Sequence, residues 1–223
     1  CDTAPRLSPL RAPPGAAAAG LAETSMGQAT PEDVRTFWFG QPDLTKPPTL
    51  DKGRWWKSTP AFDAEIEDRF GSRMQEALDT GLPEWRGSPE DLLSLILLCD
   101  QFPRNVHRGT GKAFAWDARA REVATILDNQ GAPTSWQPDA LAFSWMPFEH
   151  SEAMADQDRC VARFESLAQA APQAKFYVDF AVKHRDIIAQ FGRFPHRNRA
   201  LGRDTTAEER DFLANGGPSF GQG

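Results

Sequence analysis

The segment Ser88-Pro-Glu-Asp-Leu-Leu-Ser-Leu-Ile-Leu-Leu-Cys-Asp-Gln-Phe-Pro-Arg-Asn105 decides the class of fold that this sequence predicts. Ser88 can cap a helix with its hydroxyl, and Pro89 has no N–H to lose at the first helical position. The apolar residues that follow recur at three- and four-residue spacing, which predicts one apolar helix face. Because proline disfavours the helical conformation of the residue before it, we expect this helix to span 89–101 and to end before Pro103.

The same signals recur along the chain and predict an all-α fold. Thr30-Pro31 and Thr59-Pro60 repeat the pairing of a capping hydroxyl with a proline, and Thr205-x-x-Glu208 has the pattern of a capping box. Strand signals are weak, because no stretch of strict apolar and polar alternation is bounded by turn residues. Short connections favour antiparallel helical hairpins that stack on one another. We expect about eight helices, over 31–39, 60–80, 89–101, 113–129, 138–146, 147–170, 173–191 and 206–214.

Length and composition favour one globular domain. The chain has 223 residues, of which 40% are hydrophobic and 25% are charged, so it is long enough to bury one core and too apolar to be wholly disordered. We expect a single all-helical domain over 26–215. An Ala-, Pro- and Gly-rich extension over 1–25 is predicted to be disordered, and a tail over 216–223 is predicted to be flexible.

Charge and cysteine content narrow the expected partners and compartment. A net charge of −6 argues against nucleic-acid binding, since the molecule as a whole repels phosphate backbones. No run of about 18 apolar residues occurs, which argues against a membrane-spanning helix and a membrane partner. The three cysteines, Cys1, Cys99 and Cys160, form no Cys-x-x-Cys pair. We interpret them as reduced structural thiols and expect a cytoplasmic protein.

Two segments share a pattern that gathers polar residues after an apolar helix. They are Asp100-Gln-Phe-Pro-Arg-Asn-Val-His-Arg-Gly109, called here the first corner, and Gly192-Arg-Phe-Pro-His-Arg-Asn-Arg-Ala-Leu-Gly202, the second corner. Each contains Phe-Pro, then Arg-Asn, then a glycine. We interpret both as helix ends from which Arg and Asn project sideways. Two such corners could face one another.

Helix phase turns two titratable side chains towards the core. Asp100 continues the apolar stripe of its helix, and a buried carboxylate needs a donor such as Arg104 or an arginine of the second corner. His184 lies on the apolar side of the helix expected over 173–191. Both residues also have a purely structural interpretation, Asp100 as part of a buried ion pair that holds the corner and His184 as a satisfied core histidine.

A third polar group is Met146-Pro-Phe-Glu-His-Ser-Glu152, in which Pro147 either begins a new helix or kinks a continuous one. If a helix begins at Pro147, His150 faces the core. Glu149 and Glu152 then lie one turn apart and could act as an acid and base pair. They could equally be first-turn acids that complement the helix dipole.

None of the sequence spacings that are specific for metal, phosphate or dinucleotide binding appears, so we expect no metal and no cofactor. If the protein is an enzyme, the candidate catalytic residues are Asp100, Glu149, His150 and His184. The candidate ligand-binding residues are Gln101, Arg104, Asn105, Arg185, Arg193, His196, Arg197 and Asn198.

Several motifs together resemble a known family. They are Phe37-Trp-Phe-Gly40, Arg54-Trp-Trp56, Pro60-Ala-Phe-Asp63, Asp100-Gln-Phe-Pro-Arg-Asn105, Pro147-Phe-Glu-His-Ser-Glu152, and His184-Arg-Asp-Ile-Ile188 with Phe191-Gly-Arg-Phe-Pro-His-Arg-Asn198. In this order they resemble the bacterial "domain of unknown function 924" family over roughly Pro31 to Phe220. The resemblance implies an all-helical fold similar to tetratricopeptide-like helical repeats, and no established activity.

Three functional hypotheses follow from the sequence. The leading one is a binding module whose Arg, His, Asn and Glu side chains line a polar pocket for an anionic small molecule or a peptide end. The second is a hydrolase or lyase that uses a carboxylate and a histidine as acid and base. The third is a structural or protein-interaction module in which the polar network fixes helix register. The sequence leaves the oligomeric state open.

Overall fold

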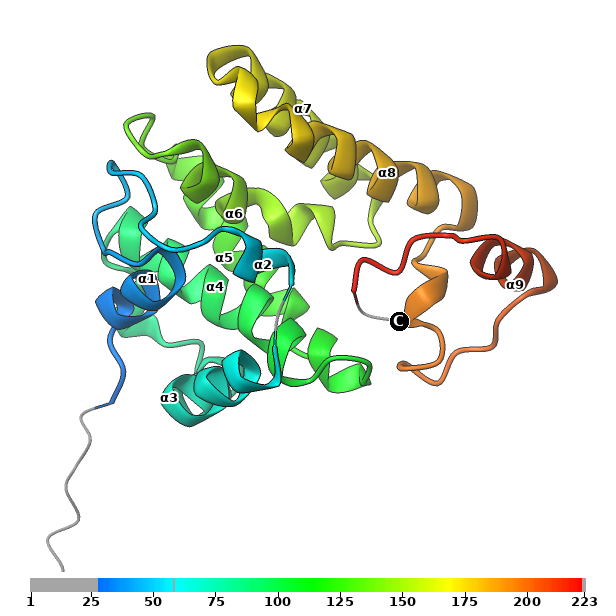
Figure 1. Cartoon of the computed structure of the whole chain (residues 1–223), viewed down its shortest axis with the longest axis horizontal. Coiled ribbons are helices and arrows are strands. Elements are labelled where there is room, and N and C mark those ends of the chain that lie inside the picture. The colour runs from blue at the N-terminus through cyan, green and yellow to red at the C-terminus, as the bar shows by residue number, and fades with distance from the viewer. Residues whose placement is uncertain (1–27, 58, 222–223) are drawn as a thin grey trace, which may run out of the picture.

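The computed structural model describes residues 28–57 and 59–221, and in that part of the chain it contains helices and no strands, which confirms the predicted all-α class (Figure 1). The expected disordered extension over 1–25 lies outside the described residues. Short 3-10 turns at 83–86, 111–114, 172–174 and 195–197 join several of the helices. The helices are α1 (Pro31–Phe39), α2 (Gly53–Trp56), α3 (Pro60–Asp79), α4 (Pro89–Val106), α5 (Asp117–Gln130), α6 (Pro138–Glu149), α7 (Met154–Ala170), α8 (Lys175–Phe191) and α9 (Ala207–Ala214).

Side-chain caps begin the helices where the sequence predicts them. The hydroxyls of Thr30, Thr59 and Ser88 each accept a backbone hydrogen bond from the residue three positions later. The capping box of α9 is shifted by one residue from the predicted position, to Thr206 and Glu209. Both registers fit the sequence pattern, but the Glu209 carboxylate also binds the side chain of Arg193 at 2.6 Å. This tertiary contact accounts for the observed register.

Helix α4 forms the centre of the fold. Every residue from Leu92 to Asn105 is buried, as expected of a helix that is apolar around most of its circumference. It packs against α1, α3, α5 and α6. At its C-terminal end Phe102 lies in an aromatic cluster, with its ring 5.0 Å from Phe70 and 5.7 Å from Trp38.

Two predicted helix ends are wrong, because Pro103 and Pro147 lie inside helices. α4 continues through Pro103 to Val106. Proline removes one N–H, but the Arg104 guanidinium and the Asn105 amide donate to the Asp100 and Gln101 carbonyls at 2.8 Å each, which supplies donors to the last turns. Packing against four helices stabilises this continuation.

Pro147 is the second proline that was predicted to mark a helix boundary. It lies within α6 instead of beginning a new helix. α6 ends at Glu149, His150 forms its C-cap, and α7 begins only at Met154. The prediction of one long helix over 147–170 is therefore replaced by a helix end followed by a short loop. α2 was not predicted, because its four residues are too few to show a helical period.

Helices α7 and α8 pack against each other, and both contact α6 (Figure 1). After α8 the chain passes through the second corner to α9, and the red C-terminal segment in Figure 1 then returns towards α8. Among the described helices, none has the length and apolar character needed to cross a membrane.

Candidate functional site

A cavity of about 410 Å³ opens between α2, α4, α6, α8 and the segment that follows α9. Its walls are mainly aromatic, with Trp55 and Trp56 from α2 and Phe176, Tyr177 and Phe180 from α8. Its polar lining residues come from α4 and the turn that follows it, from the end of α6 and from α8. They are Gln101, Arg104, Asn105, Arg108, Glu149, His150 and His184.

The first polar pair in the cavity joins α4 to the end of α6. The Nδ1 atom of His150 lies 2.7 Å from Oδ1 of Asp100, and the carboxylate also accepts a hydrogen bond from the Gln101 amide at 2.6 Å. Arg104 adds an ion pair to Asp100 at 3.2 Å. Asp100 is fully buried. Asp100 therefore faces the interior, as its helix phase predicts, and Arg104 is one of its ion-pair partners, as expected.

The electrostatics of this pair favour a carboxylate beside a neutral imidazole. Burial by itself would raise the pKa of Asp100, but the neighbouring His150 and Arg104 outweigh it and lower that pKa to about 2. Burial, reinforced by the Arg104 charge, lowers the pKa of His150, although Asp100 acts in the opposite direction. At neutral pH the Asp100 carboxylate can therefore accept the Nδ1–H of His150, which leaves Nε2 as the basic nitrogen.

The second polar pair joins α8 to the end of α6. The Nδ1 atom of His184 lies 2.8 Å from Oε1 of Glu149 and 2.9 Å from the carbonyl oxygen of Phe180. The imidazole rings of His184 and His150 are 6.2 Å apart. Both imidazoles and Glu149 thus line one cavity, and the buried Asp100 lies behind His150. The four candidate catalytic residues form these two imidazole and carboxylate pairs.

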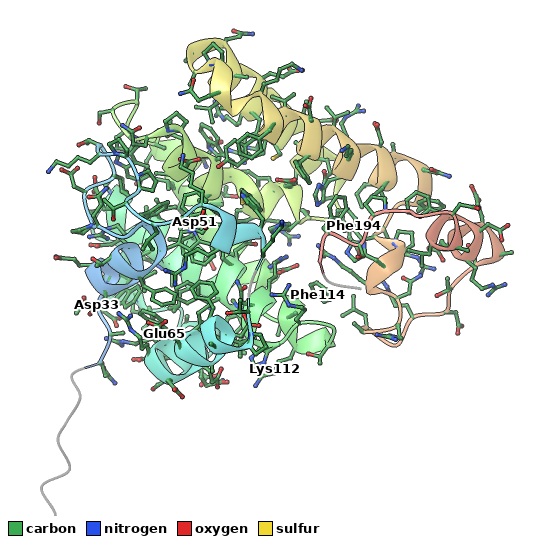
Figure 2. The ribbon with its side chains drawn as sticks, viewed as in Figure 1. Asp33, Asp51, Glu65, Lys112, Phe114 and Phe194 are labelled. Atoms are coloured by element: carbon green, nitrogen blue, oxygen red, sulfur yellow. The ribbon has the colours of Figure 1, made fainter. Side chains whose placement is uncertain are left out.

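The two corners meet at Asp117, the first residue of α5. Its carboxylate lies 2.9 Å from Nη2 of Arg104 and 3.3 Å from Nη1 of Arg197. The Arg197 guanidinium also lies over the rings of Phe114 and Phe194, at 4.6 and 4.4 Å, and these two residues are labelled in Figure 2. Burial and the nearby Arg104 charge lower the pKa of Arg197 to about 10, against the opposing effect of Asp117. Asp117 was not among the predicted site residues.

Several other predicted ligand-binding residues lie outside the cavity lining. Arg185 forms an ion pair with Asp158 at 2.6 Å on the exposed side of α8. Arg193 and Asn198 both bind Glu209, at 2.6 and 3.2 Å, and so attach α9 to the second corner.

His196 also lies at the second corner, with its ring 5.5 Å from that of Phe194. Burial, followed in size by the Arg197 charge, lowers the pKa of His196 to about 3. Of the predicted ligand-binding residues, Gln101, Arg104 and Asn105 line the cavity.

The predicted pairing of Glu149 with Glu152 does not occur. Glu149 faces His184, whereas Glu152 accepts two hydrogen bonds from Arg203, at 2.8 and 3.1 Å, and one from the backbone N–H of Phe194 at 2.8 Å. The prediction required a helix that began at Pro147. Because α6 ends at Glu149, the two carboxylates do not share a helical turn.

Sequence reasoning missed the aromatic walls of the cavity and Arg108. Trp55 and Trp56 were noted only as part of a family motif, and Arg108 only as a position within the first corner. Tryptophans are usually placed in the core, and no catalytic or ligand-binding spacing surrounds this pair, so no local signal marked these residues as a wall. Within the described ranges, no group of three or more His, Cys, Asp or Glu side chains is arranged to hold a metal ion.

Comparison with known proteins adds a family and a related structure. Residues 34–217 match the family described as "Bacterial protein of unknown function (DUF924)". A solved structure of a protein of unknown function from Agrobacterium tumefaciens is 36% identical, with a TM-score of 0.72, and the match covers 83% of this chain and 97% of that one. No curated protein shows a significant match to the sequence.

Proposed function

The chain belongs to the DUF924 family of bacterial proteins of unknown function, and from this premise we propose that it binds a small ligand in the cavity between α2, α4, α6 and α8. The ligand has an apolar body and an anionic or strongly hydrogen-bonding head. The observation that carries the proposal is the cavity itself, with aromatic walls and a cluster of buried polar side chains.

The size and lining of the cavity support a small-molecule site. Its volume of about 410 Å³ falls within the range of roughly 300 to 1,000 Å³ that is typical of ligand pockets, which combine apolar walls with a few converging polar groups. Trp56, Phe176 and Phe180 are more exposed than the rest of the wall. Exposed aromatic side chains that border a cavity are a common feature of binding sites.

Four polar side chains of the cavity carry N–H donors from guanidinium or amide groups. Arg104 and Arg108 carry guanidinium groups, and Gln101 and Asn105 carry amides. A guanidinium binds a carboxylate or phosphate through charge-assisted hydrogen bonds, which are about twice as strong as neutral ones. This composition favours a ligand whose head is anionic or rich in oxygen.

Thermal-shift measurements on the full chain against a panel of small metabolites test this proposal. We expect compounds that raise the melting temperature of the native protein to lose at least about fivefold in affinity when Trp56→Ala or Phe180→Ala removes part of the wall. Val182→Ala is the matched control, because Val182 lies on α8 beside the cavity residues but does not line the cavity. Equal losses in all three variants, or no stabilising compound at all, would refute the proposal and favour the structural interpretation.

Acid and base catalysis is a second candidate, favoured by the two imidazole and carboxylate pairs. A neutral His150 whose Nδ1 faces an ionised Asp100 has the arrangement of a general base that acts through Nε2. His184 with Glu149 supplies a second proton-transfer group on the same cavity. Hydrolysis and elimination both commonly use one group that accepts a proton and one that donates it.

A screen of hydrolase and lyase substrates tests this second candidate. We expect any activity to fall by about a hundredfold or more in His150→Gln, in line with the usual contribution of a general base, with a melting temperature close to that of the native protein. An activity that persists in both His150→Gln and His184→Gln would rule out this mechanism.

We also propose that the stacked helix pairs form a tetratricopeptide-like scaffold and that the protein acts in the cytoplasm. The packed pair of α7 and α8 supports the scaffold. Cys99 and Cys160 are buried free thiols, a state that suits a reducing compartment. Fractionation of cells that express the full chain tests the compartment.

A further inference from the structure

The segment that follows α9 returns to the cavity and occupies part of it. The ring of Phe220 stacks on the imidazole of His184, with centroids 3.6 Å apart and planes inclined by 19°. The carbonyl oxygen of Gly221 accepts a hydrogen bond from Nη1 of Arg108 at 3.1 Å. Both residues line the cavity. This segment lies in the tail that was predicted to be flexible, and it places an aromatic ring against α8 and a carbonyl oxygen against Arg108, just after α4.

Arg108 has partners of a different kind from those of Arg104. Arg104 lies 3.2 and 2.9 Å from the carboxylates of Asp100 and Asp117. The shortest hydrogen bonds of Arg108 go to neutral oxygens, the Gly221 carbonyl and the Asn105 amide oxygen at 3.3 Å, while the Asp63 carboxylate lies 3.9 Å away. A carboxylate that replaced the Gly221 carbonyl would bind Arg108 more strongly, because the bond would join two charges.

The backbone of the segment is also strained at Phe220, the residue whose ring occupies part of the cavity. Phe220 has a φ of +50°, in the left-handed region that side chains larger than glycine rarely adopt. Such a conformation persists only when its surroundings hold it, and release of the segment would relieve the strain. The contacts of Phe220 and Gly221 are therefore ones that a ligand can displace.

We propose, on the basis of the ligand site proposed above, that the ligand is a small aromatic carboxylate. Its ring takes the place of the Phe220 ring on His184, and its carboxylate takes the place of the Gly221 carbonyl on Arg108. Phe220 and Gly221 act as an internal competitor that imitates the two recognised groups. The remaining space of the cavity receives substituents of the ligand.

Titration of the full chain with 3-phenylpropionate, followed by calorimetry, tests the two recognised groups. The neutral amide, 3-phenylpropionamide, should bind at least about fivefold more weakly, because it loses the charge-assisted bond to Arg108. The saturated analogue, 3-cyclohexylpropionate, should bind about two- to tenfold more weakly, because it cannot stack on His184. Equal affinity for the acid and its amide would overturn the assignment of Arg108.

Two variants test the competition. Phe220→Ala should raise the affinity for 3-phenylpropionate about two- to tenfold, because the competing ring is removed, whereas Leu78→Ala, at an exposed apolar residue of α3, should leave it unchanged. Arg108→Gln should abolish the preference for the acid over the amide. The Arg108 side chain is 40% exposed, so this variant should fold, and circular dichroism verifies that it does.

The outcomes separate this inference from the proposed function. If Phe220→Ala weakens binding, the ring is a wall of the site and not a competitor, and the inference is wrong. If another class of compound binds with the expected dependence on Trp56 and Phe180 while aromatic carboxylates do not bind, the proposed function stands and the inference fails. If no compound binds the native protein or Phe220→Ala, both fail.

Discussion

Asp117→Asn should destabilise the protein by about 3 kcal/mol, because the Asp117 carboxylate forms ion pairs with an arginine of each corner. Its oxygens lie 2.9 Å from Arg104 and 3.3 Å from Arg197, and both arginines are buried. Asparagine keeps the shape of the side chain but carries no charge, and its NH2 group would face a guanidinium. Two positive charges would then share a space from which water is largely excluded.

The magnitude follows from the burial of the three groups. Removal of one partner from a fully buried ion pair costs roughly 3 to 5 kcal/mol. Asp117 keeps 21% side-chain exposure, and Arg104 retains Asp100 as a second partner, so the lower end of that range applies. For a domain of this size, a loss of about 3 kcal/mol lowers the melting temperature by roughly 6 to 12 °C.

Urea unfolding at pH 7, followed by tryptophan fluorescence, measures the free energy of unfolding. Asp158→Asn is the matched control, because it makes the same change in the ion pair with Arg185, where the Asp158 side chain is 54% exposed, and it should cost far less because solvent screens exposed ion pairs. The cost of Asp117→Asn should also shrink in an Arg197→Met background, where only one arginine remains. If Asp117→Asn costs no more than Asp158→Asn, the account of the shared carboxylate is refuted.

Three further predictions concern pH, the core and α9. The pKa of His196 is lowered to about 3, so the unfolded chain binds the proton more tightly than the folded one. The free energy of unfolding therefore keeps its full value above pH 6.5 and decreases as the pH falls towards 3. At pH 5 the decrease is about 2 kcal/mol. His196→Gln should flatten this part of the stability profile, and an unchanged slope would contradict the assignment. Phe102→Ala should cost about 3 to 5 kcal/mol in urea unfolding, since the ring is fully buried among aromatic side chains, and a loss below about 1 kcal/mol would argue against the described packing. Glu209→Gln removes the charge that binds Arg193 and caps α9. Amide hydrogen exchange should therefore become faster in α9 and change little elsewhere. An equal increase in exchange rate across the whole chain would show that α9 does not open separately.

Local patterns in the sequence predicted the helices and the orientation of some polar side chains. Capping hydroxyls followed by proline marked the starts of α1, α3 and α4, because a cap acts within three residues of the chain. Helix phase turned Asp100 and His184 towards the interior, and both are buried. Proline gave the wrong ends for α4 and α6, because side-chain donors and packing against neighbouring helices offset its local effect.

The contacts that build the site depend on tertiary structure alone. His150 and Asp100 are 50 positions apart in the chain, Arg197 and Asp117 are 80 apart, and Arg108 and Gly221 are 113 apart. Periodicity specifies which way a side chain leaves its own helix, but it carries no information about which helix lies opposite. The sequence by itself therefore determined the all-helical class and the family motifs. The cavity, the two imidazole and carboxylate pairs, and the placement of Phe220 on His184 were decided by how α4, α6, α8 and the segment after α9 pack, because only packing brings these distant groups within contact.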